Sequence, residues 1–266
     1  MNTETKKTAV FLALTFIVCL PFYILISRNS GEFYIPSIIM IMWAPGLSAI
    51  AVKLIFDKNL RRFGWKPGKL KYLGLGYILP LFGGILVYGI VWTTGAGELN
   101  IEKISENFMP RILMAATLGV FVSILTAAGE EIGWRGFLLP EILKRYSPLK
   151  TSLIVSVIWA LYHYPGIFFS SYTSGTGSWY AVLFFTLQII GLTFIMTWLW
   201  IKSGSLWPAV ILHASHNLFI QSVFDSLTKD TGETIYFTTD FGVGLALFYG
   251  AAAVLLWKRK KIISTA

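Results

Sequence analysis

Residues 128–140 read AGEEIGWRGFLLP and stand at the end of a long apolar run. The stretch contains two adjacent carboxylates, Glu130 and Glu131, and the guanidinium of Arg135. Charged groups at membrane depth are costly in free energy unless they are paired or hydrated. We therefore expect a polar cluster at this point, enclosed by the apolar helices that the rest of the chain supplies.

The composition is that of an integral membrane protein. Of the 266 residues, 55% are hydrophobic and only 13% are charged, and the mean hydropathy is +0.67. A soluble domain does not bury this much apolar surface. The net charge of +9 would suggest nucleic-acid binding in a soluble chain, but here the bases lie between apolar runs and indicate membrane orientation. Cys19 is the only cysteine, which excludes an internal disulfide and a cysteine-rich zinc site.

Eight apolar runs predict an all-α fold, a polytopic membrane bundle of about eight transmembrane helices. Each run has about twenty residues, enough to cross roughly 30 Å of hydrocarbon as a helix. We expect one transmembrane domain over residues 1–266, with the functional motifs in a core at residues 111–224. The predicted spans are about Thr8–Ile26, Tyr34–Phe56, Tyr72–Thr93, Arg111–Ala128, Thr151–Phe169, Trp179–Ile201, Ser205–Phe224 and Phe241–Trp257.

The basic residues predict how the bundle is oriented. Eighteen of the 22 Lys and Arg residues fall at one end of the predicted spans, and four at the other. Cytoplasmic loops carry the excess of bases, so both termini are predicted to be cytoplasmic, with a retained first helix. The opposite loops lean acidic and include Asp225 and Asp240. The basic segment 57–71 is either an element lying along the inner membrane surface or an ordinary positive loop.

The two glutamates of the opening stretch are expected to have different roles. Glu131 and Arg135 are four residues apart with the acid first, the favourable order for a helical ion pair. Neighbouring residues of a helix point about 100° apart, so Glu130 is left to face the bundle interior as a candidate general base. The three glycines of the stretch allow close approach of another helix or of a substrate backbone. The alternative is an interfacial ion pair that only closes a helix end.

His163 lies inside the fifth predicted span, thirteen residues after Lys150 and thus roughly 20 Å along a helix. Trp159 precedes it by one turn and can pack against its ring. A lone interior histidine is often only a packing residue. However, Pro165-Gly166 is expected to interrupt the helix beside it, and broken helices at membrane depth usually line a cavity.

His213 and Asn217 are four residues apart in the seventh predicted span and share one helix face. Both side chains can donate a hydrogen bond to one oxygen, as the donors of an oxyanion hole do. Helix–helix hydrogen bonding is the simpler alternative. His216 is within a turn of His213, and its role stays open. All three histidines of the chain fall in these two spans.

The sequence lacks the motifs of other hydrolase classes. There is no His-Glu-x-x-His zinc motif and no Gly-x-Ser-x-Gly nucleophile motif. A carboxylate, histidines and an amide remain, and they suit attack by a base-activated water, with or without a metal.

Three motifs occur in order on separate predicted spans: Glu-Glu-x-x-x-Arg at 130–135, aromatic-x-x-x-His at 159–163 and His-x-x-x-Asn at 213–217. Together they resemble the CAAX protease and bacteriocin-processing family, also called the Abi family, which includes the type II CAAX prenyl endopeptidases. The resemblance covers roughly residues 111–224. The chain departs from the family at Trp159, where Phe is more frequent.

The resemblance implies an intramembrane glutamate protease without a cofactor. Glu130 with His163 would activate the attacking water, and His213 with Asn217 would stabilise the oxyanion. Glu131 and Arg135 match supporting positions of the motif. No metal is expected, although zinc held by Glu130, His163 and His213 is the nearest alternative.

The expected partners are the lipid bilayer and a peptide or protein substrate, either prenylated or a bacteriocin-type precursor, with no nucleic acid. A bacterial cell membrane is the expected location. A function of another class is a membrane transporter or immunity-type binding protein, in which the same acids and histidines form a proton relay or a partner site.

Overall fold

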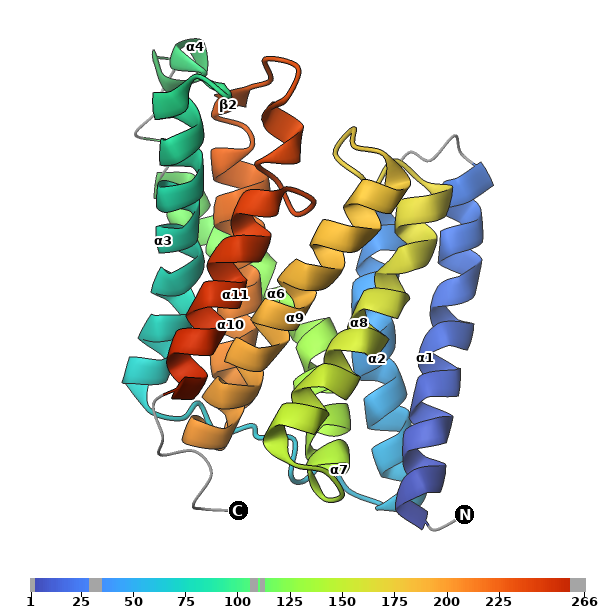
Figure 1. Ribbon diagram of the computed structural model, residues 1–266. Coiled ribbons are helices and arrows are strands. Elements are labelled where there is room, and N and C mark those ends of the chain that lie inside the picture. Colours follow the sequence, from blue (N-terminus) through green and yellow to red (C-terminus); the bar gives the residue numbers. More distant parts are fainter. Residues whose placement is uncertain (1–2, 29–34, 106–109, 111–112, 259–266) are drawn as a thin grey trace.

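The apolar runs form helices that stand side by side in the computed structural model of the chain (Figure 1), an all-α bundle. The structure describes residues 3–28, 35–105, 110 and 113–258. The predicted span starts at Tyr34 and Arg111 and most of the basic tail at 258–261 lie outside these residues. The long helices are α1 (Thr3–Arg28), α2 (Ile35–Phe56), α3 (Leu70–Thr94), α8 (Pro148–Phe169), α9 (Ser178–Ser203) and α11 (Val243–Lys258).

Shorter elements connect these helices or divide two of the predicted spans. Two-residue strands β1 and β2 pair antiparallel, with Glu98 opposite Lys229. The short elements are β1 (Glu98–Leu99), α4 (Ile101–Ser105), the π-helical η1 (Ala115–Gly119), α6 (Val120–Glu131), the π-helical η2 (Ile132–Leu138), α7 (Leu139–Leu143), α10 (Trp207–His216), the π-helical η3 (Asn217–Phe224), β2 (Thr228–Lys229) and the 3₁₀ turn η4 (Thr234–Tyr236).

Five of the eight predicted spans are single helices long and apolar enough to cross a membrane, namely α1, α2, α3, α8 and α9. The fourth and seventh predicted spans are divided between α-helical and π-helical segments, and α11 has 16 residues. The count of eight spans therefore stays a prediction. π-Helical turns occur often at functional sites, and here two of them lie within or directly after the polar motifs.

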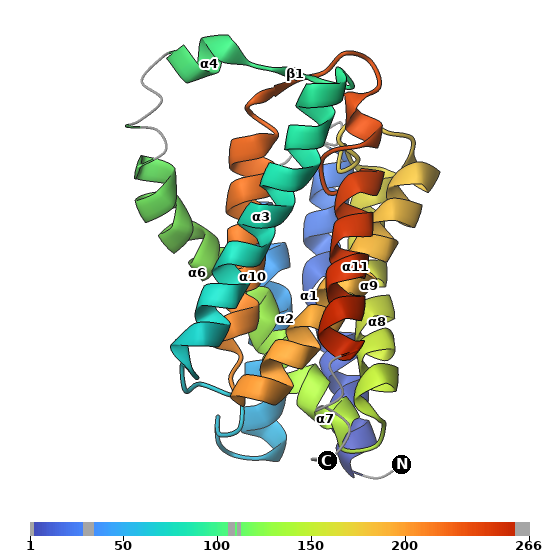
Figure 2. The same ribbon diagram turned by 60° about the vertical axis from the view of Figure 1, so that its left-hand side comes forward.

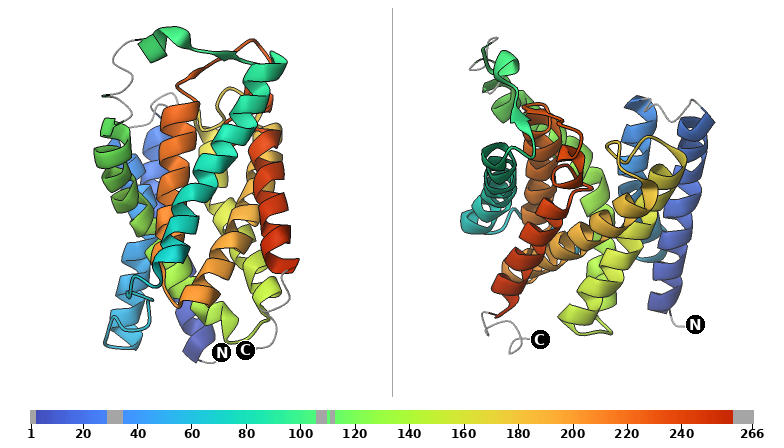
Figure 3. Two further views of the ribbon diagram at one scale, coloured as in Figure 1. Left: turned by 90° about the vertical axis from the view of Figure 1, so that its left-hand side faces the viewer. Right: turned by 45° about the horizontal axis from the view of Figure 1, so that its top comes forward.

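Helix α9 runs obliquely between two groups of helices (Figure 2; Figure 3, right). It contacts α8 on one side and α11 on the other, while α6 contacts both α2 and α10. The start of α1, the end of α11, α7 and the connection between α2 and α3 lie at one end of the bundle (Figure 1), which is the base-rich end. The first polar motif thus comes from α6 and η2, the second from α8, and the third from α10 and η3.

Glycines bring α6 and η2 against α2, as the opening stretch predicted. A Cβ on Gly129 would lie 2.7 Å from the carbonyl oxygen of Met42. A Cβ on Gly133 would lie 2.4 Å from the Pro45 Cβ and 2.6 Å from the Pro45 carbonyl carbon. Because backbone atoms cannot move aside as a flexible side chain can, this contact fixes where Glu130 sits relative to α2.

We expect Gly133→Ala to lower the melting temperature of the purified protein clearly, because the added methyl group overlaps the α2 backbone and overpacking costs about 1–3 kcal/mol. Gly89→Ala is the matched control, since a Cβ there meets no heavy atom within 4 Å. That variant is expected to keep or slightly raise the melting temperature, because alanine is the better helix former. Equal melting temperatures for the two variants would contradict the close contact.

The expected interruption at Pro165-Gly166 is wrong. Helix α8 continues through both residues to Phe169. Prolines are tolerated inside membrane helices because neighbouring groups satisfy the backbone that the ring frees. Pro165 leaves the Leu161 carbonyl without its helical donor, and in the same turn the hydroxyl of Tyr23, from α1, donates to the neighbouring carbonyl oxygen of Tyr162 at 2.8 Å.

The basic connection after α2 is irregular rather than helical between Asp57 and Lys69. Phe63 is buried beneath Gly136, and the Trp207 indole donates to the Trp65 carbonyl oxygen at 2.7 Å. At its start, Asp57 accepts hydrogen bonds from both Lys7 and Lys53. This carboxylate therefore ties α1 to α2 at the base-rich end.

Asp57→Asn is expected to lower the free energy of unfolding by about 1–3 kcal/mol at neutral pH, since it removes charged hydrogen bonds. Burial raises the pKa of Asp57, but the hydrogen bonds and charges of Lys53 and Lys7 outweigh burial and hold it below its usual value. A carboxylate with a depressed folded-state pKa stabilises the fold above its unfolded pKa, and that contribution is lost as pH falls through the folded value. The gap in melting temperature between wild type and Asp57→Asn should therefore shrink below about pH 4. A gap that is constant with pH would contradict this assignment.

Candidate active site

Glu130 lies at the end of α6 and is 3% exposed. Two indoles hold it: Nε1 of Trp134 donates to Oε2 at 3.2 Å, and Nε1 of Trp159 donates to the same oxygen at 2.7 Å. Among the described residues no hydrogen bond reaches Oε1. One oxygen of the carboxylate is thus fixed by the fold, and the other is left for a water or substrate atom.

Glu131 is fully buried and is the centre of an ionic cluster. Its Oε1 accepts from Nη1 of Arg135 at 3.0 Å and from Nδ1 of His213 at 2.9 Å. The guanidinium also donates to the Thr193 hydroxyl at 3.1 Å and lies 4.1 Å from the centroid of the Trp159 ring. The predicted Glu131–Arg135 ion pair is therefore present, and it positions both the imidazole of His213 and the indole that holds Glu130.

The charges of this cluster bear on the protonation of His213. Two carboxylates and one guanidinium are buried together, so an imidazolium at His213 makes the group neutral, and buried charges are stable only when balanced. Because an ionised carboxylate only accepts, Nδ1 of His213 carries a proton toward Glu131. In the imidazolium form, Nε2 is a donor as well.

His163 is half-buried in α8, and its Nδ1 lies 2.8 Å from the Trp159 carbonyl oxygen. A carbonyl oxygen only accepts, so Nδ1 carries the proton and Nε2 of the neutral ring has a free lone pair. The ring packs against Phe185, with centroids 5.0 Å apart, and stacks near Tyr172 at 6.2 Å. These contacts leave His163 with one nitrogen able to accept a proton.

Asn217 is the first residue of η3 and follows His213 by four residues. It is half-buried, whereas His213 is 8% exposed. The two side chains line the same cavity, as expected for residues on one helix face. An amide N–H and an imidazolium N–H can both be directed at one oxygen there.

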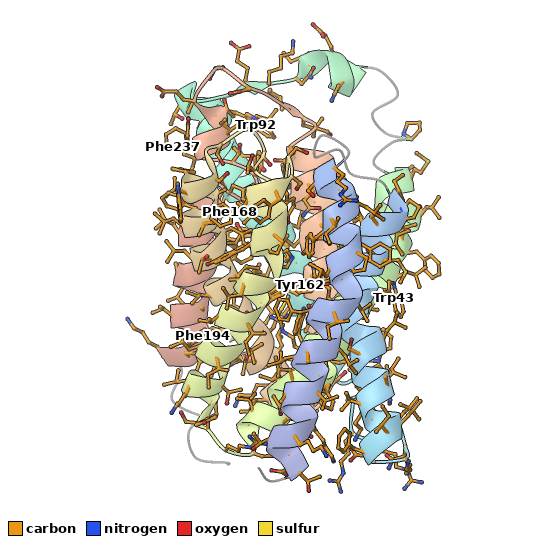
Figure 4. The ribbon with its side chains drawn as sticks, turned by 90° about the vertical axis from the view of Figure 1, so that its right-hand side faces the viewer. Trp43, Trp92, Tyr162, Phe168, Phe194 and Phe237 are labelled. Carbon is orange, nitrogen blue, oxygen red and sulfur yellow. The ribbon has the colours of Figure 1, made fainter. Side chains whose placement is uncertain are left out.

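The structure brings the four predicted catalytic residues to one cavity of about 150 Å³. Its walls come from α1, α2, α6, α8, α10 and η3. Tyr162, the neighbour of His163, lies near the mid-height of the bundle (Figure 4), so the cavity is far from both ends. The lining residues are Tyr23, Ile38, Ile41, Met42, Glu130, His163, Gly166, Tyr172, His213, Asn217 and Gln221.

Trp134 is a site residue that the sequence reasoning missed. It follows Glu130 by four residues, the same spacing that pointed to the Glu131–Arg135 pair. This spacing places the two side chains on one helix face, so the sequence already indicated that the Trp134 indole could donate to the Glu130 carboxylate.

A second polar cluster lies next to the first and gives His216 its partners. Nε2 of His216 lies 2.6 Å from Oδ1 of Asp240, and Nδ1 lies 2.8 Å from the Tyr249 hydroxyl. Asp240 also accepts from Nε2 of Gln221 at 2.7 Å. The sequence placed Asp240 among the acids of an outer loop, but the chain before α11 turns inward and leaves it 5% exposed.

The zinc alternative needs Glu130, His163 and His213 to surround one ion. Among the described residues, no group of three or more His, Cys, Asp or Glu side chains is arranged to hold a metal ion. Oε2 of Glu130 is held by two indoles and Nδ1 of His213 by Glu131, so a metal would have to bind the other atoms of these side chains.

Comparison with known proteins finds a family model that covers the three motifs. Residues 112–219 match the model described as type II CAAX prenyl endopeptidase Rce1-like. Residues 112–219 are therefore similar to the Rce1-like domain of the type II CAAX prenyl endopeptidases. This segment contains Glu130, His163, His213 and Asn217, whereas Gln221 and Asp240 lie beyond its end. Together with the five apolar helices, it makes the chain an integral membrane protein.

A curated relative agrees with the family match. The chain is 34% identical over 146 residues to CAAX prenyl protease 2 of Methanococcus maripaludis. The aligned part is 53% of this chain and 50% of that protein, so the chain spans about half the length of the relative.

Proposed function

We propose that the protein is an intramembrane endopeptidase that hydrolyses a peptide bond with a water activated by Glu130 and His163. The observation that carries the proposal is the single cavity lined by these two side chains together with His213 and Asn217. They come from three separate parts of the fold, Glu130 from α6, His163 from α8, and His213 with Asn217 from the continuous segment of α10 and η3. A base and two donors around one small cavity are what peptide hydrolysis requires.

In the proposed first step, a water in the cavity gives a proton to the free oxygen of Glu130 as its oxygen attacks the scissile carbonyl carbon. The indoles of Trp134 and Trp159 keep the carboxylate in place, because both donate to its other oxygen. Nε2 of His163 accepts a hydrogen bond from the same water and orients it. The cavity of about 150 Å³ holds a few water molecules beside a peptide group.

The carbonyl oxygen becomes an oxyanion in this step. Nε2–H of the His213 imidazolium and the side-chain amide of Asn217 would donate to it. Glu131 and Arg135 support this arrangement, since Glu131 accepts from the opposite nitrogen of His213. Loss of one oxyanion donor typically lowers kcat by about 10²–10³-fold.

In the second step, the oxyanion collapses and the C–N bond breaks. The proton that Glu130 took from water passes to the leaving nitrogen, either directly or by way of Nε2 of His163, and the nitrogen departs as an amine. The new carboxyl group holds the oxygen of the water, and the site returns to its starting charge. No covalent bond to the enzyme and no external reactant are needed.

The substrate class follows from the relative and from the position of the site. The relative is named a CAAX prenyl protease, so a prenylated peptide with a C-terminal CAAX sequence is the first candidate substrate. A bacteriocin-type precursor peptide is the second. We propose that the protein lies in a bacterial cell membrane with the base-rich end, where α1 begins and α11 ends, on the cytoplasmic side.

The test uses purified full-length protein in liposomes and three synthetic peptides: a farnesylated CAAX peptide, the same peptide without the lipid, and a leader-containing bacteriocin precursor. Cleavage of at least one peptide at a single bond, in the presence of a strong zinc chelator, is the expected result. No cleavage of any of the three would contradict the proposed substrates and activity. Activity that is lost on chelation and restored by added zinc would contradict the metal-free reaction.

A further inference from the structure

Gln221 stands in line with the two proposed oxyanion donors. It follows Asn217 by four residues and His213 by eight, and all three line the catalytic cavity. Eight residues of a regular α-helix would rotate Gln221 by about 80° away from His213. The turn is wider in η3, where the Asp225 N–H bonds to the Ile220 carbonyl oxygen five residues earlier, and this reduces the drift. The π-helical segment therefore keeps Gln221 on the cavity side.

Gln221 is exposed although it lines the cavity, so it stands at the cavity mouth. Its side chain is nevertheless held. Nε2 of Gln221 donates to Oδ2 of Asp240 at 2.7 Å, and a carboxylate can only accept, so the nitrogen must face Asp240. The amide oxygen of Gln221 then points away from Asp240, and no donor among the described residues reaches it.

The support behind Gln221 is rigid. Asp240 is 5% exposed, and its Oδ1 accepts from Nε2 of His216 at 2.6 Å. His216 is 4% exposed and is bonded at its other nitrogen to the Tyr249 hydroxyl, 2.8 Å away. A buried carboxylate held on both sides aligns the Gln221 amide, because a fully satisfied polar network has a single arrangement.

We infer that Gln221 binds the substrate, its amide oxygen accepting a backbone N–H of the peptide next to the scissile bond, while Asp240 and His216 position the amide. The inference rests on the proposed function. An acceptor is expected there because a peptide bound between the helices must have partners for its N–H groups, and each unpaired N–H group is costly. His213 and Asn217 are assigned as donors to the carbonyl oxygen, and Gln221 supplies an acceptor for an N–H group beside it.

The geometry also indicates which N–H is bound. Four residues separate Asn217 from Gln221, a rise of about 6 Å along a helix. An extended peptide advances about 3.4 Å per residue, so Gln221 reaches the backbone within about two residues of the scissile carbonyl. The bound group is therefore one of the few amides that flank the cleaved bond.

The experiment is an ester scan of the farnesylated CAAX peptide in liposomes containing the full-length protein. In each peptide one of the amides within two residues of the scissile bond is replaced by an ester, which lacks the N–H. At one position the ester is expected to raise KM about tenfold with little change in kcat, the effect of one lost hydrogen bond. If no ester substitution raises KM for the wild-type protein, the inference is overturned.

Gln221→Leu removes the acceptor and tests its identity. This variant is expected to raise KM for the all-amide peptide about tenfold and to be insensitive to the ester that weakens wild type. Asp240→Asn is expected to reduce the ester effect in part, since the Gln221 amide loses its fixed orientation. Full ester sensitivity in Gln221→Leu would overturn the inference, because the N–H would then be bound elsewhere.

Gln188→Leu is the matched control. Gln188 also reaches Asp240, with its Nε2 3.5 Å from Oδ1, but it is 1% exposed and lines only the small cavity of about 30 Å³ beside the catalytic cavity, not the catalytic cavity itself. Its Oε1 is buried without a hydrogen bond among the described residues, so leucine removes no satisfied acceptor. The ester effect is expected to persist in this variant. Its loss there would mean that any damage around Asp240 removes the effect, and would overturn the assignment to Gln221.

A binding measurement separates this inference from the proposed hydrolysis. Fluorescence anisotropy gives the Kd of the labelled farnesylated peptide and its ester analogues for the Glu130→Gln variant, which is expected not to cut them. An ester effect on Kd that disappears with Gln221→Leu would support the inference even if wild type fails to cleave the peptide. Cleavage by wild type without a Gln221-dependent ester effect would reject the inference and leave the hydrolase intact.

Discussion

Glu130→Gln is expected to lower kcat for peptide cleavage by about 10³–10⁴-fold, the upper range for removal of a positioned base. The amide is isosteric with the carboxylate, and its oxygen can still accept from the indoles of Trp134 and Trp159, which donate to one oxygen in the wild type. Its nitrogen then faces the cavity and cannot take a proton from water. The measurement is the single-turnover rate with the peptide that wild type cuts, together with the melting temperature.

The melting temperature and the Kd for the peptide are expected to stay close to those of wild type, which separates a lost base from a lost fold. Activity retained by Glu130→Gln would contradict the assignment of Glu130. A cellular phenotype that survives the double variant Glu130→Gln and His163→Ala, but not disruption of the fold, would favour a transporter or an immunity-type binding protein.

Arg135→Leu is expected to lower the free energy of unfolding by about 3–5 kcal/mol, because it leaves a buried carboxylate without its main partner. Glu131 and Arg135 are both fully buried, and Arg135 also donates to Thr193 and covers the Trp159 ring. The melting temperature of the purified variant measures the loss. A change no larger than that of an exposed ion pair would contradict the buried cluster.

The double variant Glu131→Gln with Arg135→Leu separates stability from positioning. It buries no unpaired charge, so most of the stability is expected to return. The wild-type pair is itself not fully satisfied, since Glu131 Oε2 and Arg135 Nε lack hydrogen bonds among the described residues. The kcat is expected to remain about 10²-fold below wild type, because a neutral amide no longer stabilises the His213 imidazolium as an oxyanion donor. Full recovery of kcat would show that the pair serves stability alone.

Spacing along single helices predicted much of the candidate site. The i to i+4 relation gave the Glu131–Arg135 ion pair and put His213 and Asn217 on one face, where the structure has them. Because adjacent helical residues point in different directions, Glu130 was predicted to face the bundle interior, and in the structure it lines the cavity. These relations depend only on helix geometry, which the sequence determines locally.

Contacts between helices could not be predicted in the same way. Asp240 looked like a residue of an acidic loop, yet the fold turns it inward onto His216, a partner distant in sequence. The bond between Trp159 and Glu130 likewise depends on how α8 packs on α6. The continuity of α8 past Pro165 was missed because the packing that accommodates a proline inside a membrane helix comes from other helices, and Tyr23 of α1 contacts this turn.

The central claim is that a water in this cavity attacks the peptide with Glu130 as its base. The most direct measurement is cleavage of the farnesylated peptide in water enriched in heavy oxygen, with chelator-treated wild type and Glu130→Gln in parallel, and mass analysis of both products. We predict that wild type cuts one bond and places a single solvent oxygen in the new carboxyl group, whereas Glu130→Gln binds the peptide and leaves it whole. Equal cleavage by the two proteins, or an intact peptide with both, would contradict the account.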